Sequence, residues 1–225
     1  NGGGYAAEMT TLRLARIASP LGLLTLGSVE PAPEAGASGL SWTSSEPREG
    51  PDGPRLALVE FGHRAPRGVG AIVRALEEIG ETCDVRECAR ASACPAMRDA
   101  DAQLAEYFAG ERASFDLGLF LPGTDFQQRV WRALLAIPCG EVRSYGDVAK
   151  GLGMPGASRA VGLANGANRV AIIVPCHRVI DSAGRLHGYG GGLEKKRWLL
   201  DHERAMRGDT LFAGACAVAP STGGA

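Results

Sequence analysis

Apolar and polar residues alternate in two different ways along this chain. In the first half, short apolar runs predict strands, and apolar residues spaced three and four apart predict helices between them. Strands are predicted over 12–29 (two strands around a Ser-Pro-Leu-Gly turn), 55–61 and 115–121, and helices over 69–79 and 95–108. This mixture predicts a small α/β domain.

The second part of the chain has a helical pattern. Thr124 and Gln127 form a capping box that opens a helix with one apolar face, and a short helix starts at Ser144. A third helix, over 157–167, consists mainly of small residues and follows a glycine-containing turn, so the last two helices predict a helix-turn-helix. Small residues let a backbone approach another surface closely, although dense core packing is the alternative. Arg159, at the start of this helix, favours a DNA surface.

Three segments have too few apolar residues for a packed core. Residues 1–11 and 208–225 are predicted to be a disordered start and a flexible tail. Residues 30–54 are rich in Pro, Gly, Ser and Glu and are predicted to form a long insertion. The resulting organisation is an α/β domain over 12–121 and a helical domain over 122–207.

The two domains differ in charge, although the whole chain carries a net charge of −1. Residues 1–115 hold 11 basic and 16 acidic side chains, whereas residues 116–207 hold 13 basic and 8 acidic ones. A basic domain beside an acidic one suggests an anionic partner, with nucleic acid as the first candidate. Random scatter of surface charge is an equal alternative.

Membrane and secretory features are missing from the sequence. No apolar run approaches the ~18 residues of a membrane span, and no signal-peptide pattern opens the chain. The six cysteines are too few and too irregularly spaced for a secreted disulfide framework. We therefore expect a reducing, intracellular location: cytoplasmic, or nuclear if the source is eukaryotic.

The hexapeptide Val-Pro-Cys-His-Arg-Val over 174–179 carries the candidate chemistry. Cys176 follows an apolar run over 170–174, which places its thiol on a buried wall of the fold instead of a surface loop. The pKa of a thiol, ordinarily about 8.5, falls when an imidazole or a cation lies beside it. The pattern therefore indicates a nucleophile aimed into a pocket; a structural buried cysteine is the alternative.

Six segments in a fixed order carry a family resemblance. They are Tyr145, 157–162 (Ala-Ser-Arg-Ala-Val-Gly), Asn168, 175–179 (Pro-Cys-His-Arg-Val), 188–192 (Gly-Tyr-Gly-Gly-Gly) and 198–203 (Trp-Leu-Leu-Asp-His-Glu). Together they resemble the O6-alkylguanine-DNA alkyltransferases, also called methylated-DNA–protein-cysteine methyltransferases. The resemblance is close from about 123 to 203. It is weaker over 12–121, where the family has an RNase-H-like α/β domain.

The resemblance implies an enzyme that repairs DNA by direct reversal. An alkyl group would pass irreversibly, once per molecule, from O6-alkylguanine, and from O4-alkylthymine, to Cys176. His177 would be the general base through a water, and Glu203 would orient its ring. Tyr145 would donate to guanine N3 as the purine leaves. A solvated glutamate at a helix end and a core tyrosine are the alternatives for the last two.

The resemblance also implies how DNA is held. The target nucleotide would flip out of double-stranded DNA, and Arg159 would fill the vacated stack from the minor groove, with a plain phosphate contact as the alternative. Ser182 and Ala157 would contact the DNA as well. The guanine pocket would contain the Val179 carbonyl, Tyr189, Gly190 and Asn168, with Asn168 tying the recognition helix to the active-site strand.

No cofactor and no metal are expected. Some relatives hold zinc through N-terminal Cys and His residues, but this chain has neither before His63. The spacing of Cys83, Cys88 and Cys94 is unlike that of zinc sites. We expect a monomer without membrane contact, and surface positions for His187 and His202. The rival functions are a non-catalytic alkylated-DNA-binding or regulatory protein of the same fold, and a thiol hydrolase with turnover.

Overall fold

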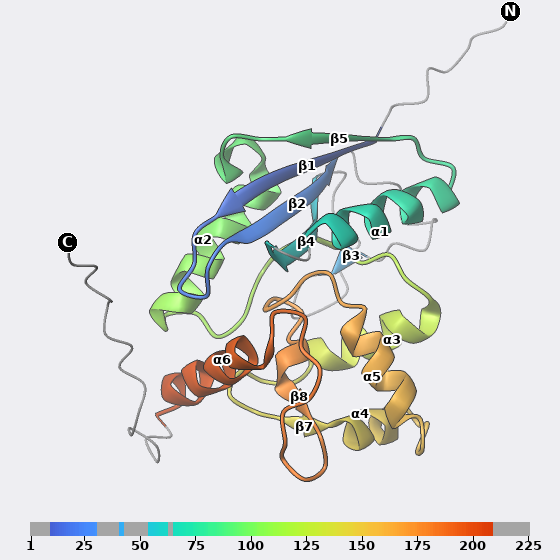
Figure 1. Ribbon diagram of the computed structural model, residues 1–225, viewed down its shortest axis with the longest axis vertical. Helices are drawn as coiled ribbons and strands as arrows, with labels where there is room; N and C mark the ends of the chain where they lie inside the picture. The colour runs from blue at the N-terminus through green and yellow to red at the C-terminus, as the bar shows by residue number, and fades with distance from the viewer. Residues whose placement is uncertain (1–9, 31–40, 43–53, 63–64, 209–225) are drawn as a thin grey trace, which may run out of the picture.

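The computed structural model describes residues 10–30, 41–42, 54–62 and 65–208. Its N-terminal half is built on a six-stranded sheet with the strand order β3-β6-β4-β2-β1-β5 (Figure 1). The strands are β1 (Thr10–Ile17), β2 (Leu24–Glu30), β3 (Ser41–Trp42), β4 (Arg55–Phe61), β5 (Cys83–Glu87) and β6 (Leu119–Phe120). The predicted disordered ends and the insertion fall almost entirely outside the described residues.

The predicted pair of strands at the start of the chain is confirmed. β1 and β2 are antiparallel, and Ile17 pairs with Leu24 beside the turn. That turn closes through hydrogen bonds between Ser19 and Gly22 in both directions, at 3.1 and 3.0 Å. The predicted strand over 55–61 is also confirmed, as β4, which lies antiparallel to β2.

Helices cover both faces of the sheet. α1 (Ala65–Glu78) packs on one face and α2 (Pro95–Ala109) on the other. β4 is buried at every position, and its apolar side chains belong to two different cores. Leu58 packs with Ile72 of α1, whereas Val59 belongs to the core that contains Leu104 of α2.

Two strand predictions differ from the structure. The strand expected over 115–121 shrinks to β6, because the Gln103 side chain hydrogen-bonds both backbone groups of Asp116, at 2.8 and 2.9 Å, outside the sheet ladder. β5 was not predicted, since its sequence, Cys-Asp-Val-Arg-Glu, is mostly polar. It pairs with β1 at the edge of the sheet, where polar side chains reach water.

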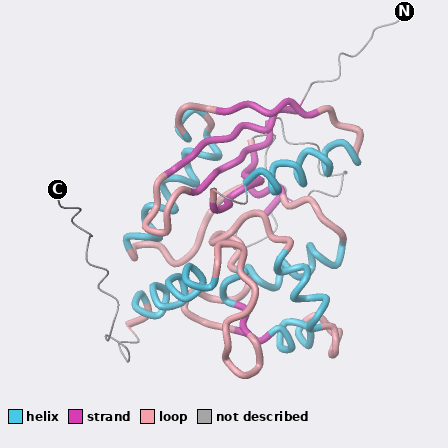
Figure 2. The backbone as a smooth tube through the Cα atoms, in the orientation of Figure 1, coloured by secondary structure: helices cyan, strands magenta, loops and turns pink. Residues whose placement is uncertain are grey.

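The C-terminal half consists of helices joined by loops, with one short pair of parallel strands (Figure 2). Its elements are α3 (Asp125–Leu135), β7 (Arg143–Ser144), α4 (Tyr145–Gly151), α5 (Ser158–Gly166), β8 (Val179–Ile180) and α6 (Leu193–Met206). The predicted capping box at Thr124 is confirmed, and Ser144 forms another with Asp147. The RNase-H-like and helix-turn-helix descriptions stay predictions.

One large core joins the two halves. The buried cluster between the sheet and α2 extends into the C-terminal half. It includes Trp131 of α3, Leu199 of α6, and Val170 in the segment after α5. Val170 also forms a parallel bridge with Val59 of β4. The segment that precedes the candidate nucleophile is therefore anchored to the sheet, while the domain boundary at 121/122 stays a prediction.

Within the described ranges, no helix is long and apolar enough to cross a membrane.

Candidate active site

The apolar run before Cys176 is a turn and not the expected strand. Only Val170 bridges to the sheet, and the Val174 N–H bonds back to the Val170 carbonyl at 2.9 Å. Ile172 has φ 72°, a left-handed conformation that costs a β-branched residue about 1–2 kcal/mol. Ile172 is fully buried, so the surrounding core holds this strained turn in place.

Two asparagines tie the end of α5 to this turn. Asn168 donates from Nδ2 to the Val174 carbonyl at 2.9 Å and accepts from the Val170 N–H at 3.0 Å. This is the tie expected for Asn168, made to a turn instead of a strand. Asn165 donates from Nδ2 to the Cys176 carbonyl at 3.3 Å. The sequence analysis missed Asn165, because nothing distinguishes it within the small-residue helix.

Cys176 begins a 3₁₀ turn, Cys176–Arg178, and is 6% exposed. It lines a cavity of about 30 Å³, room for a water or two, together with residues from both halves of the molecule. The lining includes Asn165, Gly166, Asn168, Tyr189 and Gly190, and from β4 Glu60 and Phe61. Expected pocket residues Tyr189, Gly190 and Asn168 therefore lie with Cys176, and β4 supplies a wall that was not predicted.

The glycine-rich loop over 188–192 packs closely against Phe61 of β4. The Phe61 and Tyr189 rings meet edge to face, with centroids 6.0 Å apart. A Cβ added at Gly191 would collide with the Phe61 ring, so the loop keeps this course only with glycine there.

His177 and Glu203 form the expected pair across 26 residues of sequence. Both side chains are fully buried, and 2.8 Å separates His177 Nε2 from Glu203 Oε1. Burial lowers the pKa of His177, the charges of Arg178 and Lys196 lower it further, and Glu203 opposes them. The neutral ring donates from Nε2, because an ionised carboxylate only accepts. Nδ1, which has no hydrogen-bond partner among the described residues, is left as an acceptor.

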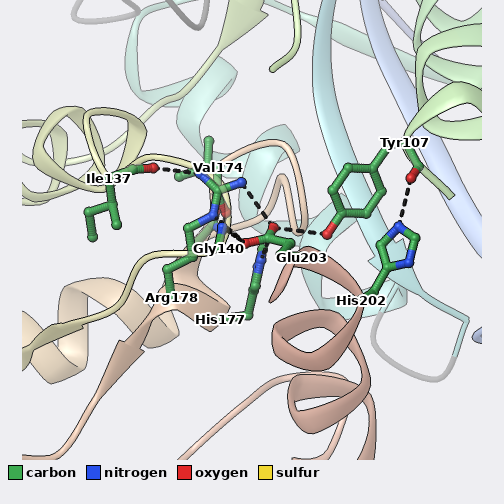
Figure 3. A network of polar contacts seen from close by, with 9 residues as sticks. Tyr107, Ile137, Gly140, Val174, His177, Arg178, His202 and Glu203 are labelled. Atoms are coloured by element: carbon green, nitrogen blue, oxygen red, sulfur yellow. Dashed lines mark hydrogen bonds and ion pairs between the residues drawn. The ribbon is translucent and has the colours of Figure 1, made fainter. Parts of the chain in front are cut away.

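Glu203 is the centre of a buried network (Figure 3). Arg178 donates to both carboxylate oxygens at 2.9 Å, the Gly140 N–H donates at 2.9 Å and the Tyr107 hydroxyl at 2.9 Å. Burial opposes ionisation, but the hydrogen bond from His177 and the pairing with Arg178 hold the pKa of Glu203 well below its ordinary value. Glu203 is thus a carboxylate at neutral pH, ready to stabilise a protonated His177.

Three members of this network were missed from the sequence. Arg178 belongs to the Pro-Cys-His-Arg motif, but the motif carries no sign of a partner 25 residues later. Tyr107 lies 96 residues before Glu203, and Gly140 contributes only its backbone. Such contacts have no local sequence signal.

Tyr145 is the first residue of α4 and is half-buried. Burial raises the pKa of its hydroxyl, and the charges of Cys176 and Asp181 raise it further, so the phenol remains a proton donor. The role of Tyr145 as a donor to guanine N3 stays a prediction.

The expected pocket carbonyl has a donor of its own. Lys196 Nζ donates to the Val179 carbonyl at 2.6 Å and to the His187 carbonyl at 2.9 Å. Lys196 is fully buried, and burial lowers the pKa of its ammonium group. Sequence analysis missed it because a Lys-Lys pair near the start of a helix is typical of a surface.

The expected DNA contacts lie on the surface. Arg159 is exposed on the first turn of α5, Ala157 precedes that helix, and Ser182 is exposed in the turn after β8. Leu163, one turn beyond Arg159, is 75% exposed and was not singled out from the sequence.

The two remaining histidines behave differently. His187 is exposed as predicted, with its Nε2 3.0 Å from Asp181. The prediction for His202 is wrong: it is half-buried, stacks on Trp198 with centroids 4.8 Å apart, and donates to the Tyr107 carbonyl at 2.7 Å. Histidine is a polar residue type, so the position of His202 in a helix did not predict its stacking on Trp198.

Among the described residues, no group of three or more His, Cys, Asp or Glu side chains could hold a metal ion. The five cysteines in the described ranges form no disulfide, and Cys216 lies outside them.

Comparisons with known proteins agree with this geometry. Residues 125–205 match the family model for the DNA-binding domain of 6-O-methylguanine DNA methyltransferase. The chain is 64% identical over 112 residues to a methylated-DNA–protein-cysteine methyltransferase of Mycobacterium tuberculosis, covering 49% of this chain and 68% of that protein. A Mycobacterium leprae protein of the same name is 48% identical over 163 residues, covering 72% and 95%. The crystal structure of Mycobacterium tuberculosis OGT in complex with DNA is similar with a TM-score of 0.59 and 42% identity, covering 86% of this chain and 94% of that one.

Proposed function

This chain belongs to the methylated-DNA–protein-cysteine methyltransferase family, and from that premise we propose how its own residues carry out the transfer. The protein binds DNA and repairs it by alkyl transfer to a cysteine. Our proposal assigns Cys176 as the acceptor of an alkyl group from O6 of guanine, and from O4 of thymine, in duplex DNA. Each molecule, acting as a monomer, reacts once.

The main support for this assignment is the buried series of side chains Cys176, His177 and Glu203 beside the cavity. Cys176 lines the cavity, His177 follows it directly with an acceptor nitrogen, and Glu203 fixes the other nitrogen at 2.8 Å. A nucleophile, a base and a group that orients the base are the parts that activated-thiol chemistry needs. A non-catalytic DNA-binding protein would have no use for the thiol in this series.

The proposed step is an in-line displacement. The thiol proton passes to His177 Nδ1 through a water as sulfur attacks the alkyl carbon. The S–C bond forms while the C–O6 bond breaks, and guanine leaves as an anion that accepts a hydrogen bond at N3 from Tyr145. The resulting imidazolium is stabilised by Glu203. The thioether product does not hydrolyse, so the site is consumed.

Access to the cavity requires the nucleotide to leave the duplex. Flipping a base costs a few kcal/mol, and Arg159 offsets this cost by filling the vacated stack. The Gly-rich loop with Tyr189 and Gly190 lines the cavity and contacts the base when it enters. Asn168 keeps the thiol-bearing turn in place, Ala157 and Ser182 contact the backbone of the DNA, and the Val179 carbonyl accepts from the exocyclic amine.

The assignment is tested with a duplex that carries O6-methylguanine with a labelled methyl group. We expect one methyl group per protein molecule, mapped by peptide mass analysis to Cys176, and no further product however long the incubation. Repeated turnover, or tight binding without an adduct, would refute the proposal.

Substitution Arg159→Ala is expected to slow the reaction with duplex DNA by about tenfold to a hundredfold. No side chain then fills the vacated stack, so the full cost of flipping the base opposes the reaction. The reaction with free O6-benzylguanine, which needs no flipping, should keep its rate. Both rates are measured in single-turnover assays. Arg98→Ala, an exposed arginine of α2, is the control for loss of one positive charge. An equal loss with the free base would contradict the role of Arg159.

A further inference from the structure

Tyr107 brings a buried hydroxyl from the N-terminal half into the catalytic network. It lies on α2, whose buried face also includes Met97, Ala100 and Leu104, and it is fully buried. Its hydroxyl donates to Glu203 Oε1 at 2.9 Å, the same oxygen that faces His177 Nε2 (Figure 3). The α/β half of the molecule is therefore in direct contact with the group that orients the base.

The position of this hydroxyl is determined by packing. The Tyr107 ring contacts the rings of Phe108, Phe115 and His202, with centroids 5.2 to 5.5 Å apart. His202 of α6 also donates to the Tyr107 carbonyl at 2.7 Å. α2 and α6 are thus linked at two points, which leaves the hydroxyl little freedom to turn away from Glu203.

Oε1 of Glu203 is shared by three donors. They are Tyr107, His177 and Nη2 of Arg178, while Oε2 accepts from Nε of Arg178 and from the Gly140 N–H. Each donor withdraws part of the negative charge of the carboxylate, so each weakens the pull of Glu203 on the others. Tyr107 does this without adding a charge of its own.

The sharing of Glu203 Oε1 affects the protonation of His177, because opposing effects act on that ring. Glu203 favours the imidazolium, whereas burial and the cations Arg178 and Lys196 disfavour it. The Cys139 thiol also lies near Glu203, and burial together with that carboxylate raises the pKa of the thiol to about 11, so it adds no charge at neutral pH. The protonation of His177 therefore depends on how strongly Oε1 acts as an acceptor.

We propose that Tyr107 is a positioning residue for alkyl transfer, which fixes Glu203 through its hydroxyl and keeps His177 in the neutral form that accepts the thiol proton. This inference rests on the proposed function. It gives the N-terminal half a direct part in the chemistry, beyond packing.

Substitution Tyr107→Phe keeps the ring contacts and removes the hydroxyl. We expect the acid limb of the single-turnover rate against pH to move to higher pH, because Glu203 then pulls harder on His177 and stabilises its protonated form. At neutral pH, the rate with an O6-methylguanine duplex should fall by about tenfold, the effect of one hydrogen bond to a charged group. An acid limb identical to that of the unaltered protein would overturn the inference.

A second variant tests for a shift of the acid limb in the opposite direction. It remains informative even if Tyr107→Phe disturbs the packing of the core. Replacing Tyr107 with 3-fluorotyrosine makes the hydroxyl a stronger donor in nearly the same volume, so the acid limb should move to lower pH. Phe115→Leu is the matched control: it loosens the packing around Tyr107 and lowers stability, but it should leave the acid limb in place. A shift with Phe115→Leu equal to that with Tyr107→Phe would show a purely structural role.

The two proposals fail separately. If the unaltered protein forms no alkylated Cys176, the proposed function fails. If the unaltered protein forms the adduct and neither Tyr107 variant moves the acid limb, only the role of Tyr107 fails.

Discussion

Substitution Cys176→Ala is expected to abolish alkyl transfer while binding of an O6-methylguanine duplex is retained. The thiolate supplies the electron pair for the new S–C bond, and no other side chain in the described cavity lining is a comparable nucleophile. We expect the single-turnover rate to fall by at least about a thousandfold. Binding should persist because the expected DNA contacts, Arg159 and Ser182, lie on the surface and are untouched.

The measurement pairs mass analysis of the adduct with fluorescence anisotropy of a labelled duplex. Cys83→Ser is the control, because Cys83 lies on the edge strand β5, outside the cavity. Methyl transfer to another cysteine in the Cys176→Ala protein would contradict the assignment of the acceptor.

Substitution Glu203→Gln is expected to damage both stability and activity. The buried cation of Arg178 would lose its carboxylate partner, and breaking a buried ion pair from one side costs about 3–5 kcal/mol. The amide also brings donors where Tyr107, Gly140 and Arg178 all donate. Transfer should slow by at least about a hundredfold, because His177 loses the carboxylate that orients its ring and stabilises its imidazolium.

The same substitution changes how stability depends on pH. The pKa of Glu203 is lowered in the folded protein, so its contribution is fully present above the ordinary value of about 4.3 and is lost as pH falls toward the folded value. The pKa of His177 is also lowered, so stability starts to fall below about pH 6.5, where the unfolded chain binds a proton that the buried ring refuses. The unaltered protein should therefore lose stability on acidification in both ranges.

Urea unfolding at a series of pH values tests this prediction. In the Glu203→Gln protein, the dependence below about pH 4.3 should flatten, since the carboxyl group is gone, while the loss that starts near pH 6.5 remains. Glu194→Gln, an exposed residue in the first turn of the same helix, is the control. Unfolding curves like those of the unaltered protein would contradict the importance of the network.

Local sequence patterns predicted most of the helices. The capping box at Thr124 and the helix start at Ser144 are confirmed, because both depend on residues three apart in the chain. The predicted helix over 95–108 is confirmed as α2, and that over 69–79 overlaps α1, which starts four residues earlier and ends at Glu78. Strands were less predictable: β5 exists only because β1 lies beside it, and β6 is short because Gln103 of α2 holds the segment before it.

By itself, the sequence determined the family, the candidate nucleophile and the candidate base beside it. Cys176 and His177 are neighbours in a motif, and the order of the six segments around them is specific. A close physical pairing of His177 with Glu203 was expected from the resemblance, and the structure brings them to 2.8 Å.

Only the tertiary structure decided what surrounds that pair. The donors to Glu203 come from positions 107, 140, 177 and 178, and a wall of the cavity comes from β4. The turn over 170–174 holds Ile172 at φ 72° only because the surrounding core and Asn168 hold it. A buried charge is stable only when it is hydrogen-bonded, and its partners are the groups that tertiary packing places beside it. Those groups are distant in the chain, so no local sequence pattern predicts them.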